Sequence, residues 1–154
     1  MKQNEKEFEK LSKNEIKKIE LSKNEIIIAK TIFDFFENTN HEALITYGGL
    51  SKKLNEIGLK HKADVLHKPL DSINRWCNYY YNAPMISVIV INHAVGRPGD
   101  GFYKSYRDIK KIEIIDSHKN EIFLNEWKKV RDYQEWDNLH RTISDLFDNI
   151  PKNE

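Results

Sequence analysis

The feature that most restricts the fold is a run of β-branched residues that leads into a rigid loop. Residues 86–92 have the sequence ISVIVIN, and five of the first six are Ile or Val, so the run predicts a strand buried on both faces. Residues 93–101 then contain three of the chain's six glycines and one of its four prolines. Glycine permits positive φ and proline fixes its own φ, so a tight, shaped loop is expected. The residues that would shape it are Gly96, Pro98, Gly99, Asp100 and Gly101.

The composition limits the class of protein. With 154 residues, 39% of them hydrophobic, the chain can build one core and is too short for two ordinary domains. The single cysteine, Cys77, excludes an internal disulfide, and no Cys/His cluster has zinc spacing. No apolar run has the length of a membrane span, and residues 1–15 lack the apolar core of a signal peptide. We therefore expect a cytoplasmic protein with no metal, no cofactor and no membrane partner.

Helical periodicity on both sides of the apolar run completes the expected organisation. The hexapeptide LSKNEI occurs twice, and two copies ten residues apart form neither a heptad repeat nor a solenoid, so local helical redundancy explains them. The predicted fold class is α+β and helix-rich, with a winged helix-turn-helix core, a small β-hairpin and added N- and C-terminal helices. The expected segments are a polar helical arm at 1–20, a core helix at 21–40, the winged-helix-like core at 43–103, a second, weaker strand at 109–115 and C-terminal helices at 117–150.

Two short helices joined by a turn are predicted before the apolar run. In the first, roughly residues 50–57, apolar residues recur at helical spacing, and Gly58 can end the helix in a left-handed conformation. The second begins near Pro69, which suits the first turn of a helix, and continues to about Tyr80. Cys77 falls on its apolar stripe, which indicates a buried structural thiol. Together the two helices form a helix-turn-helix pattern.

The charge distribution indicates a nucleic-acid partner, although the formal net charge is only +1. Residues 51–111 contain eleven Lys and Arg against five Asp and Glu, and this basic centre coincides with the helix-turn-helix and the loop. Such an arrangement can contact the phosphates of duplex DNA, with the loop as a wing. Arg97 would then reach the DNA backbone or minor groove. The expected DNA-binding residues are Tyr47, Ser51, Lys52, Lys53, Lys60, His61, Lys62, Lys68, Arg75, Arg97, Lys104 and Arg107.

Two segments of the core carry a family resemblance. One is ITYGGLSKKLNEIG at 45–58, and the other, after the second helix, is PMISVIVINHAVG at 84–96. Over about residues 43–101 the chain resembles the C-terminal winged-helix domain of O6-alkylguanine-DNA alkyltransferases and alkyltransferase-like proteins. That family has an Ile/Val-Ser/Thr-Tyr motif before its helix-turn-helix, then Pro-Cys-His-Arg-Val-Val and a glycine-containing turn. The resemblance implies a DNA-binding winged helix in which Tyr47 presses on the backbone at the target nucleotide.

The resemblance also implies that the family's chemistry is lost. Met85 stands at the position of the reactive cysteine, and Ile86 and Ser87 stand at the positions of the histidine and arginine. Without the cysteine there is no alkyl acceptor. The base-flipping arginine has no clear counterpart, since only His61 and Lys62 lie near its position. The main expectation is therefore a non-catalytic protein that binds double-stranded DNA.

Two other functions stay open. The motifs Y-G-x-L and G-x-P-G-x-G-F are similar to ones in small proteins of phage and restriction loci, which suggests an interaction module or inhibitor that binds a host defence or nuclease component, or a homodimer. A small metal-dependent nuclease could use His93 with Asp100, although the spacing is not diagnostic. Asp108, Glu113 and Asp116 form a second such set with the same weakness. Whether the loop binds DNA, protein or a small ligand is left undecided.

Overall fold

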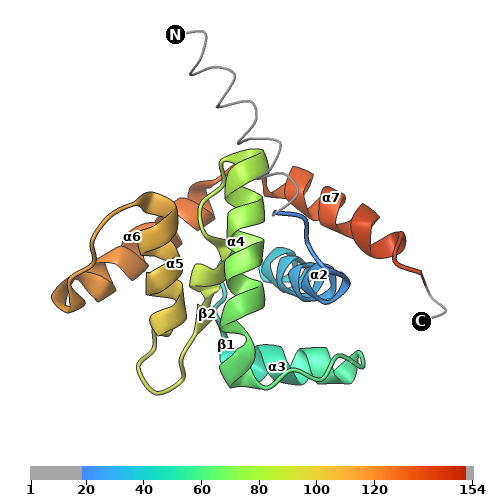
Figure 1. Ribbon diagram of the computed structural model, residues 1–154, viewed down its shortest axis with the longest axis horizontal. Coiled ribbons are helices and arrows are strands. Elements are labelled where there is room, and N and C mark those ends of the chain that lie inside the picture. The colour runs from blue at the N-terminus through green and yellow to red at the C-terminus, as the bar shows by residue number, and fades with distance from the viewer. Residues whose placement is uncertain (1–18, 152–154) are drawn as a thin grey trace, which may run out of the picture.

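A computed structural model describes residues 19–151, which form six α-helices and one two-stranded sheet (Figure 1). The predicted polar arm at 1–20 lies almost entirely outside the described residues. Helix α2 (Lys23–Asn38) confirms the predicted core helix. Its start follows from a capping box, because the Ser22 Oγ accepts a hydrogen bond from the Glu25 N–H at 3.2 Å and the Glu25 carboxylate accepts one from the Ser22 N–H at 2.8 Å. The face of α2 that enters the core carries Ile28, Ala29, Ile32, Phe33 and Phe36.

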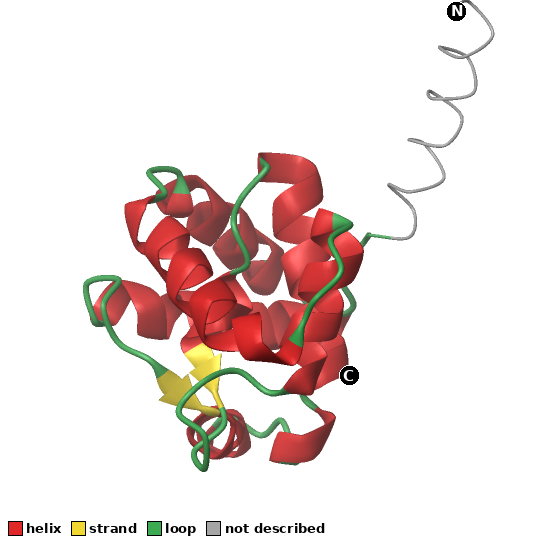
Figure 2. Cartoon of the chain, turned by 90° about the vertical axis from the view of Figure 1, so that its left-hand side faces the viewer, coloured by secondary structure: helices red, strands yellow, loops and turns green. Residues whose placement is uncertain are grey.

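The sheet differs from the predicted hairpin. Strand β1 (Ile45–Thr46) pairs in parallel with β2 (Val90–Ile91), and Figure 2 shows both strands at one edge of a helical body. The first half of the predicted strand is a 3-10 helix, η2 (Ile86–Ile89). The prediction of a long strand was wrong because β1 offers only two residues for pairing. Residues 86–89 are buried on all sides, so their composition fits either conformation.

A buried polar contact accompanies the 3-10 turn. The Asn74 side chain, 1% exposed, donates to the Ser87 Oγ at 2.6 Å and accepts from the Ser87 N–H at 3.1 Å. Both groups are removed from water, so each needs such a partner. Next to it, the Met85 N–H donates to the buried Glu126 carboxylate at 2.8 Å. These contacts fix the chain just before β2.

The two predicted short helices are present. Helix α3 (Tyr47–Glu56) begins three residues earlier than predicted, because the Thr46 Oγ caps it by accepting from the Gly49 N–H at 2.9 Å. Gly58 follows with φ +87°. A 3-10 turn, η1 (Ala63–Val65), leads to α4 (His67–Tyr81), which contains the predicted second helix and has Pro69 in its first turn. Helix α3 lies across the lower end of α4 (Figure 1).

A helix, not a second strand, follows the glycine-rich loop. Helix α5 (Asp100–Lys110) follows its N-cap residue Gly99 and buries Phe102 and Tyr103, so the strand predicted at 109–115 was wrong. Lys110 ends this helix, and 112–115 has no regular structure. The only hairpin-like contact in the described loop is an isolated antiparallel bridge between Asn92 and Arg97.

The C-terminal segment contains the helices that were predicted at 117–150. After a 3-10 turn, η3 (Asp116–His118), come α6 (Lys119–Asp132) and α7 (Trp136–Asp148). Helix α7 packs on α2, where the Trp136 ring lies 5.8 Å from Phe33 and 5.7 Å from Phe36 between ring centroids. Among the described helices, none has both the length and the apolar character needed to cross a bilayer.

Candidate nucleic-acid interface

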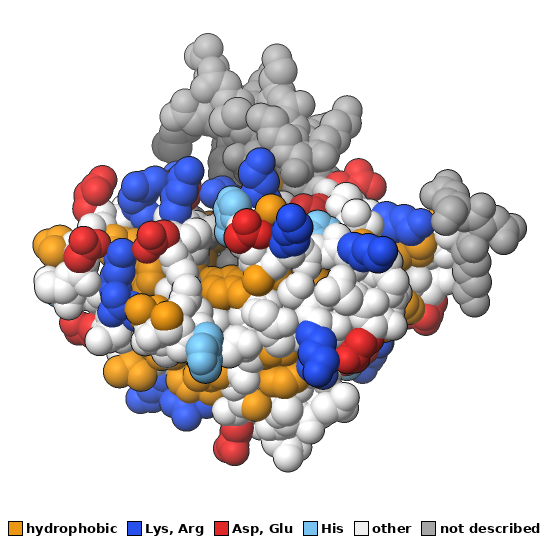
Figure 3. All heavy atoms as spheres, turned by 90° about the horizontal axis from the view of Figure 1, so that it is seen from below, with side chains coloured by type: hydrophobic (Ala, Val, Ile, Leu, Met, Phe, Trp, Pro, Cys, Tyr) orange, Lys and Arg blue, Asp and Glu red, His pale blue; other side chains and the backbone are white. Residues whose placement is uncertain are grey.

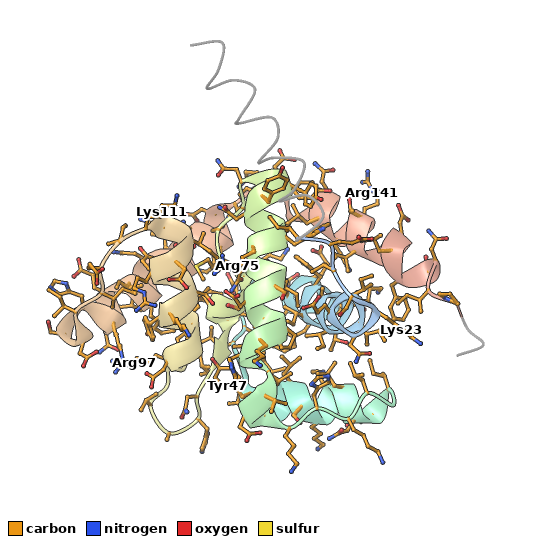
Figure 4. All side chains as sticks on the ribbon, viewed as in Figure 1. Lys23, Tyr47, Arg75, Arg97, Lys111 and Arg141 are labelled. Carbon is orange, nitrogen blue, oxygen red and sulfur yellow. The ribbon has the colours of Figure 1, made fainter. Side chains whose placement is uncertain are left out.

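Tyr47 joins the two halves of the predicted DNA-binding region. It follows β1 as the first residue of α3, and its ring lies near the lower end of α4 (Figure 4). The Tyr47 Oη accepts a hydrogen bond from the Gly99 N–H at 3.0 Å. Burial raises the pKa of the Tyr47 hydroxyl, and the negative charge of Asp100 adds a smaller increase. The residue is thus a neutral tether between α3 and the start of α5.

A cavity of about 470 Å³ opens beside this tether. It lies between η1, the start of α4 and the start of α5, and its ionisable side chains besides Tyr47 are Asp64, His67 and Asp100. The two carboxylates make the cavity itself a poor site for phosphate. The sequence predicted that Tyr47 and the loop belong to the binding region, but it did not indicate that Asp64, His67 and Asn92 line the same cavity. The lining residues are Tyr47, Ala63, Asp64, His67, Asn92, Gly99, Asp100 and Gly101.

The close approach of α4 and α5 shapes one wall of this cavity. A Cβ at Gly101 would lie 2.7 Å from the His67 Cβ, closer than real Cβ contacts come. Glycine is therefore needed at position 101 for the two helices to pack at this distance. Gly101 is thus required by the close packing and not, as predicted, by a positive φ. Among the loop glycines only Gly96, with φ +70°, has a positive φ.

Four predicted phosphate-binding lysines are exposed around the turn from α3 to α4. Lys52 is on α3, Lys60 and Lys62 are in the turn, and Lys68 is in the first turn of α4. Within residues 19–151, none of the four forms an ion pair. Lys53 is also exposed, and its Nζ lies 5.7 Å from the centre of the Phe35 ring. Five lysines thus accompany only two carboxylates, Glu56 and Asp64, over residues 47–68.

Figure 3 shows the molecule from the end that carries α3. Blue Lys and Arg side chains lie at several points of this face, with acidic and apolar side chains among them. The surface is therefore mixed, with an excess of cations contributed by the turn. Nearby, the Ser51 Oγ donates a short hydrogen bond to the His61 carbonyl oxygen, which closes the turn between α3 and η1.

Other predicted DNA-binding residues are neutralised within the fold. The Arg75 Nε lies 3.0 Å from an Asp71 oxygen, and its Nη2 lies 3.7 Å from Asp108. The Arg107 Nε lies 3.3 Å from Asp108, while the Ser105 Oγ donates a short hydrogen bond to Asp71. These contacts form a polar seam between α4 and α5. Lys104 is exposed on α5.

The eleven basic residues of 51–111 are not brought onto one surface. Figure 4 shows Arg75 midway along α4 and Lys111 at the opposite end of α5 from Arg97. Lys110 faces the interior instead, with its Nζ 3.8 Å from the buried Glu126 carboxylate. Within the described residues, the α3 to α4 part of the basic centre gathers four exposed lysines without ion pairs, whereas Lys104 and Lys111 are exposed singly on and after α5.

The loop presents different residues from those expected. The Arg97 side chain is half-buried and its Nη1 donates to the Asn120 Oδ1 at 2.9 Å, so it points toward α6. The exposed tip consists of His93, Ala94, Val95 and Gly96, and Val95 is 59% exposed. Pro98 is buried at the base of the loop. The tip therefore offers an imidazole and apolar surface in place of the expected guanidinium.

Three of the candidate acid/base groups, Asp100, Asp108 and Asp116, are held in ion pairs. Lys119 lies 3.2 Å from Asp116 and 3.4 Å from Asp100, and hydrogen bonds to these carboxylates raise the pKa of its ammonium group. Burial raises the pKa of Tyr103, whose hydroxyl donates to the Lys119 carbonyl oxygen, to about 12. No cluster of three potential metal ligands is found within the described part of the chain.

Cys77 and Met85 are both in the interior. Cys77 is fully buried, which raises the pKa of its thiol and confirms the predicted structural cysteine. Met85, at the position of the alkyltransferase cysteine, is 1% exposed. Comparison of the chain with protein-family models, with curated proteins and with solved structures finds no match to any of them.

Proposed function

We propose that the protein binds double-stranded DNA without catalysing a reaction on it, through the face formed by α3, the turn and the start of α4. The observation that carries this proposal is the grouping of four exposed lysines around one turn, none of which has an ion-pair partner among residues 19–151: Lys52, Lys60, Lys62 and Lys68. A lysine that is already neutralised by a carboxylate gains little from a phosphate, whereas a free one releases counterions from DNA when it binds. The lysines contact the backbone, and the start of α4 is the part that meets a groove.

The proposed interface excludes several residues expected from the sequence. Arg75 and Arg107 belong to the α4–α5 seam, and Arg97 is held by Asn120. The loop tip leaves the fold at the same lower end of the molecule as α3 (Figure 1) and contributes His93 and Val95 as further contacts. The interface is thus smaller than the basic centre, with about four phosphate contacts.

This number sets the expected salt dependence. Four phosphate contacts give a slope of about −3.6 for the logarithm of the association constant against the logarithm of salt concentration. Affinity for a fluorescent duplex should then fall roughly 100-fold between about 50 and 200 mM salt. Fluorescence anisotropy titrations measure both quantities. An absence of salt-sensitive binding at micromolar protein contradicts the proposal.

A matched pair of double variants locates the interface. Lys60→Ala with Lys62→Ala removes two free cations of the turn and should lower the salt slope by about 2. Lys128→Ala with Lys129→Ala removes the same charge from exposed positions of α6 and should leave the slope unchanged. Equal effects of the two double variants show attraction to net charge alone and count against this interface.

A further inference from the structure

The lysine face is the surface around Lys52, Lys60, Lys62 and Lys68, and an apolar groove lies at the other end of α4 from it. Its volume is about 700 Å³, and it is lined by residues from the start of the described chain, from α4 and from α7. Tyr80 and Leu146 are 44% and 36% exposed there, so the groove presents apolar side chains to solvent. Six of its eight lining residues are apolar or aromatic: Leu21, Ile26, Trp76, Tyr80, Tyr81 and Leu146, beside Glu20 and Thr142.

The chain outside the described residues joins this groove directly. Residue 18 directly precedes Ile19, which packs against the core, and Glu20 and Leu21 already line the groove. In a helix, Phe8, Leu11 and Ile16 would fall within an arc of about 140°, with Lys and Glu around them. Residues 1–18 contain six lysines and four glutamates, while α7 carries three aspartates and one arginine. The two partners are therefore complementary in both apolar surface and charge.

The repeated hexapeptide LSKNEI, at 11–16 and 21–26, explains why the first segment of the chain suits this groove. In its second copy, at 21–26, Ser22 and Glu25 form the capping box of α2, and Leu21 and Ile26 flank that box in the positions of a hydrophobic staple. These same two side chains line the groove. The first copy, at 11–16, carries Leu11 and Ile16 at identical spacing around Ser12 and Glu15. The first copy therefore supplies a second Leu–Ile pair of the same kind as the pair that already lines the groove.

We propose that residues 1–18 of this chain dock into the groove between α4 and α7 of the same molecule, with Leu11 and Ile16 as the main contacts. The occupant belongs to the same molecule because the segment begins at the edge of the groove, which gives it a high effective concentration there. The inference does not depend on DNA binding, since the groove and the lysine face are at opposite ends of α4.

Paramagnetic relaxation in the full chain tests this proposal. A nitroxide attached through Lys10→Cys lies on the polar side of the segment, and Cys77, being fully buried, stays unlabelled. In a ¹⁵N-labelled sample, the amide signals of Tyr80 and Leu146 should broaden strongly, while those of α3 should not. No broadening at Tyr80 and Leu146 overturns the proposal.

Two controls complete the experiment. In a mixture of ¹⁵N-labelled protein without nitroxide and unlabelled protein with it, the groove signals should stay sharp, and broadening there instead assigns the groove to a second copy and overturns intramolecular docking. Leu11→Glu should abolish the broadening in the single-sample experiment. Asn14→Glu adds the same charge on the polar side, and this variant should retain the broadening at Tyr80 and Leu146. Equal broadening in both variants overturns the assignment of Leu11 as a contact.

Discussion

Replacing Gly101 by alanine tests the close approach of α4 and α5 that shapes the central cavity. The added Cβ would lie 2.7 Å from the His67 Cβ, so the first turns of the two helices must separate. Overpacking of this kind costs about 1–3 kcal/mol. Against this, alanine gains up to about 1 kcal/mol over glycine in a helix. The two effects oppose each other, and a single variant cannot separate them.

Gly48 provides the matched control. It is the second residue of α3, as Gly101 is of α5, and a Cβ at position 48 would have no heavy atom within 4 Å. The gain in helix propensity is therefore common to both substitutions, and Gly101→Ala should be about 1–3 kcal/mol less stable than Gly48→Ala. Urea unfolding, followed by tryptophan fluorescence, measures this difference.

A double-mutant cycle assigns the cost to one contact. His67→Gly removes the opposing Cβ, so the double variant should recover stability relative to the sum of the single changes, with a coupling energy of at least about 0.5 kcal/mol. If Gly101→Ala is as stable as Gly48→Ala, or if His67→Gly gives no coupling, the close packing of α4 on α5 is refuted.

Three further predictions concern the interior. Glu126→Leu leaves the buried Met85 N–H without an acceptor and should lower the free energy of unfolding by about 1–3 kcal/mol in urea titrations, and an unchanged midpoint contradicts this role. Cys77 is buried and its thiol pKa is raised, so it should react with a thiol reagent only when the protein is unfolded, and rapid labelling of the folded protein is the opposing result. The pKa of Tyr103 is raised from 10.0 to about 12, so the folded state holds its proton more tightly than the unfolded state. The stability that this provides is fully present below pH 10 and is lost as the pH rises toward 12; the decline should be shallower in Tyr103→Phe.

The helices could be predicted because their evidence is local. The capping residues of α2 and the apolar spacing of α4 can be recognised in the sequence itself, and both helices lie close to their predicted positions. The segment ISVIVIN could not be assigned in this way. Its first half is a 3-10 turn in which the Ser87 N–H donates to the side chain of Asn74, a residue of α4. Its second half pairs with a strand that is only two residues long. β-branched composition indicated burial there but did not specify the conformation.

The candidate site was predictable to a similar extent. The sequence identified the lysines and Tyr47, since charge excess and motif position need no tertiary information. It could not show which basic residues are free, because Asp108 reaches Arg75 from α5 and Asn120 reaches Arg97 from α6. The groove beside Tyr80 was missed for the same reason, as its walls come from three separate segments.

The central claim is that the lysine face around the α3 to α4 turn binds duplex DNA. The most direct measurement is a titration of the ¹⁵N-labelled full chain with a short duplex, in which chemical-shift changes are mapped onto the fold. The changes should concentrate at 51–68 and at the loop tip, 93–96, and should weaken as salt is added. Shifts centred on α6 and α7, or none at any salt concentration, contradict the claim.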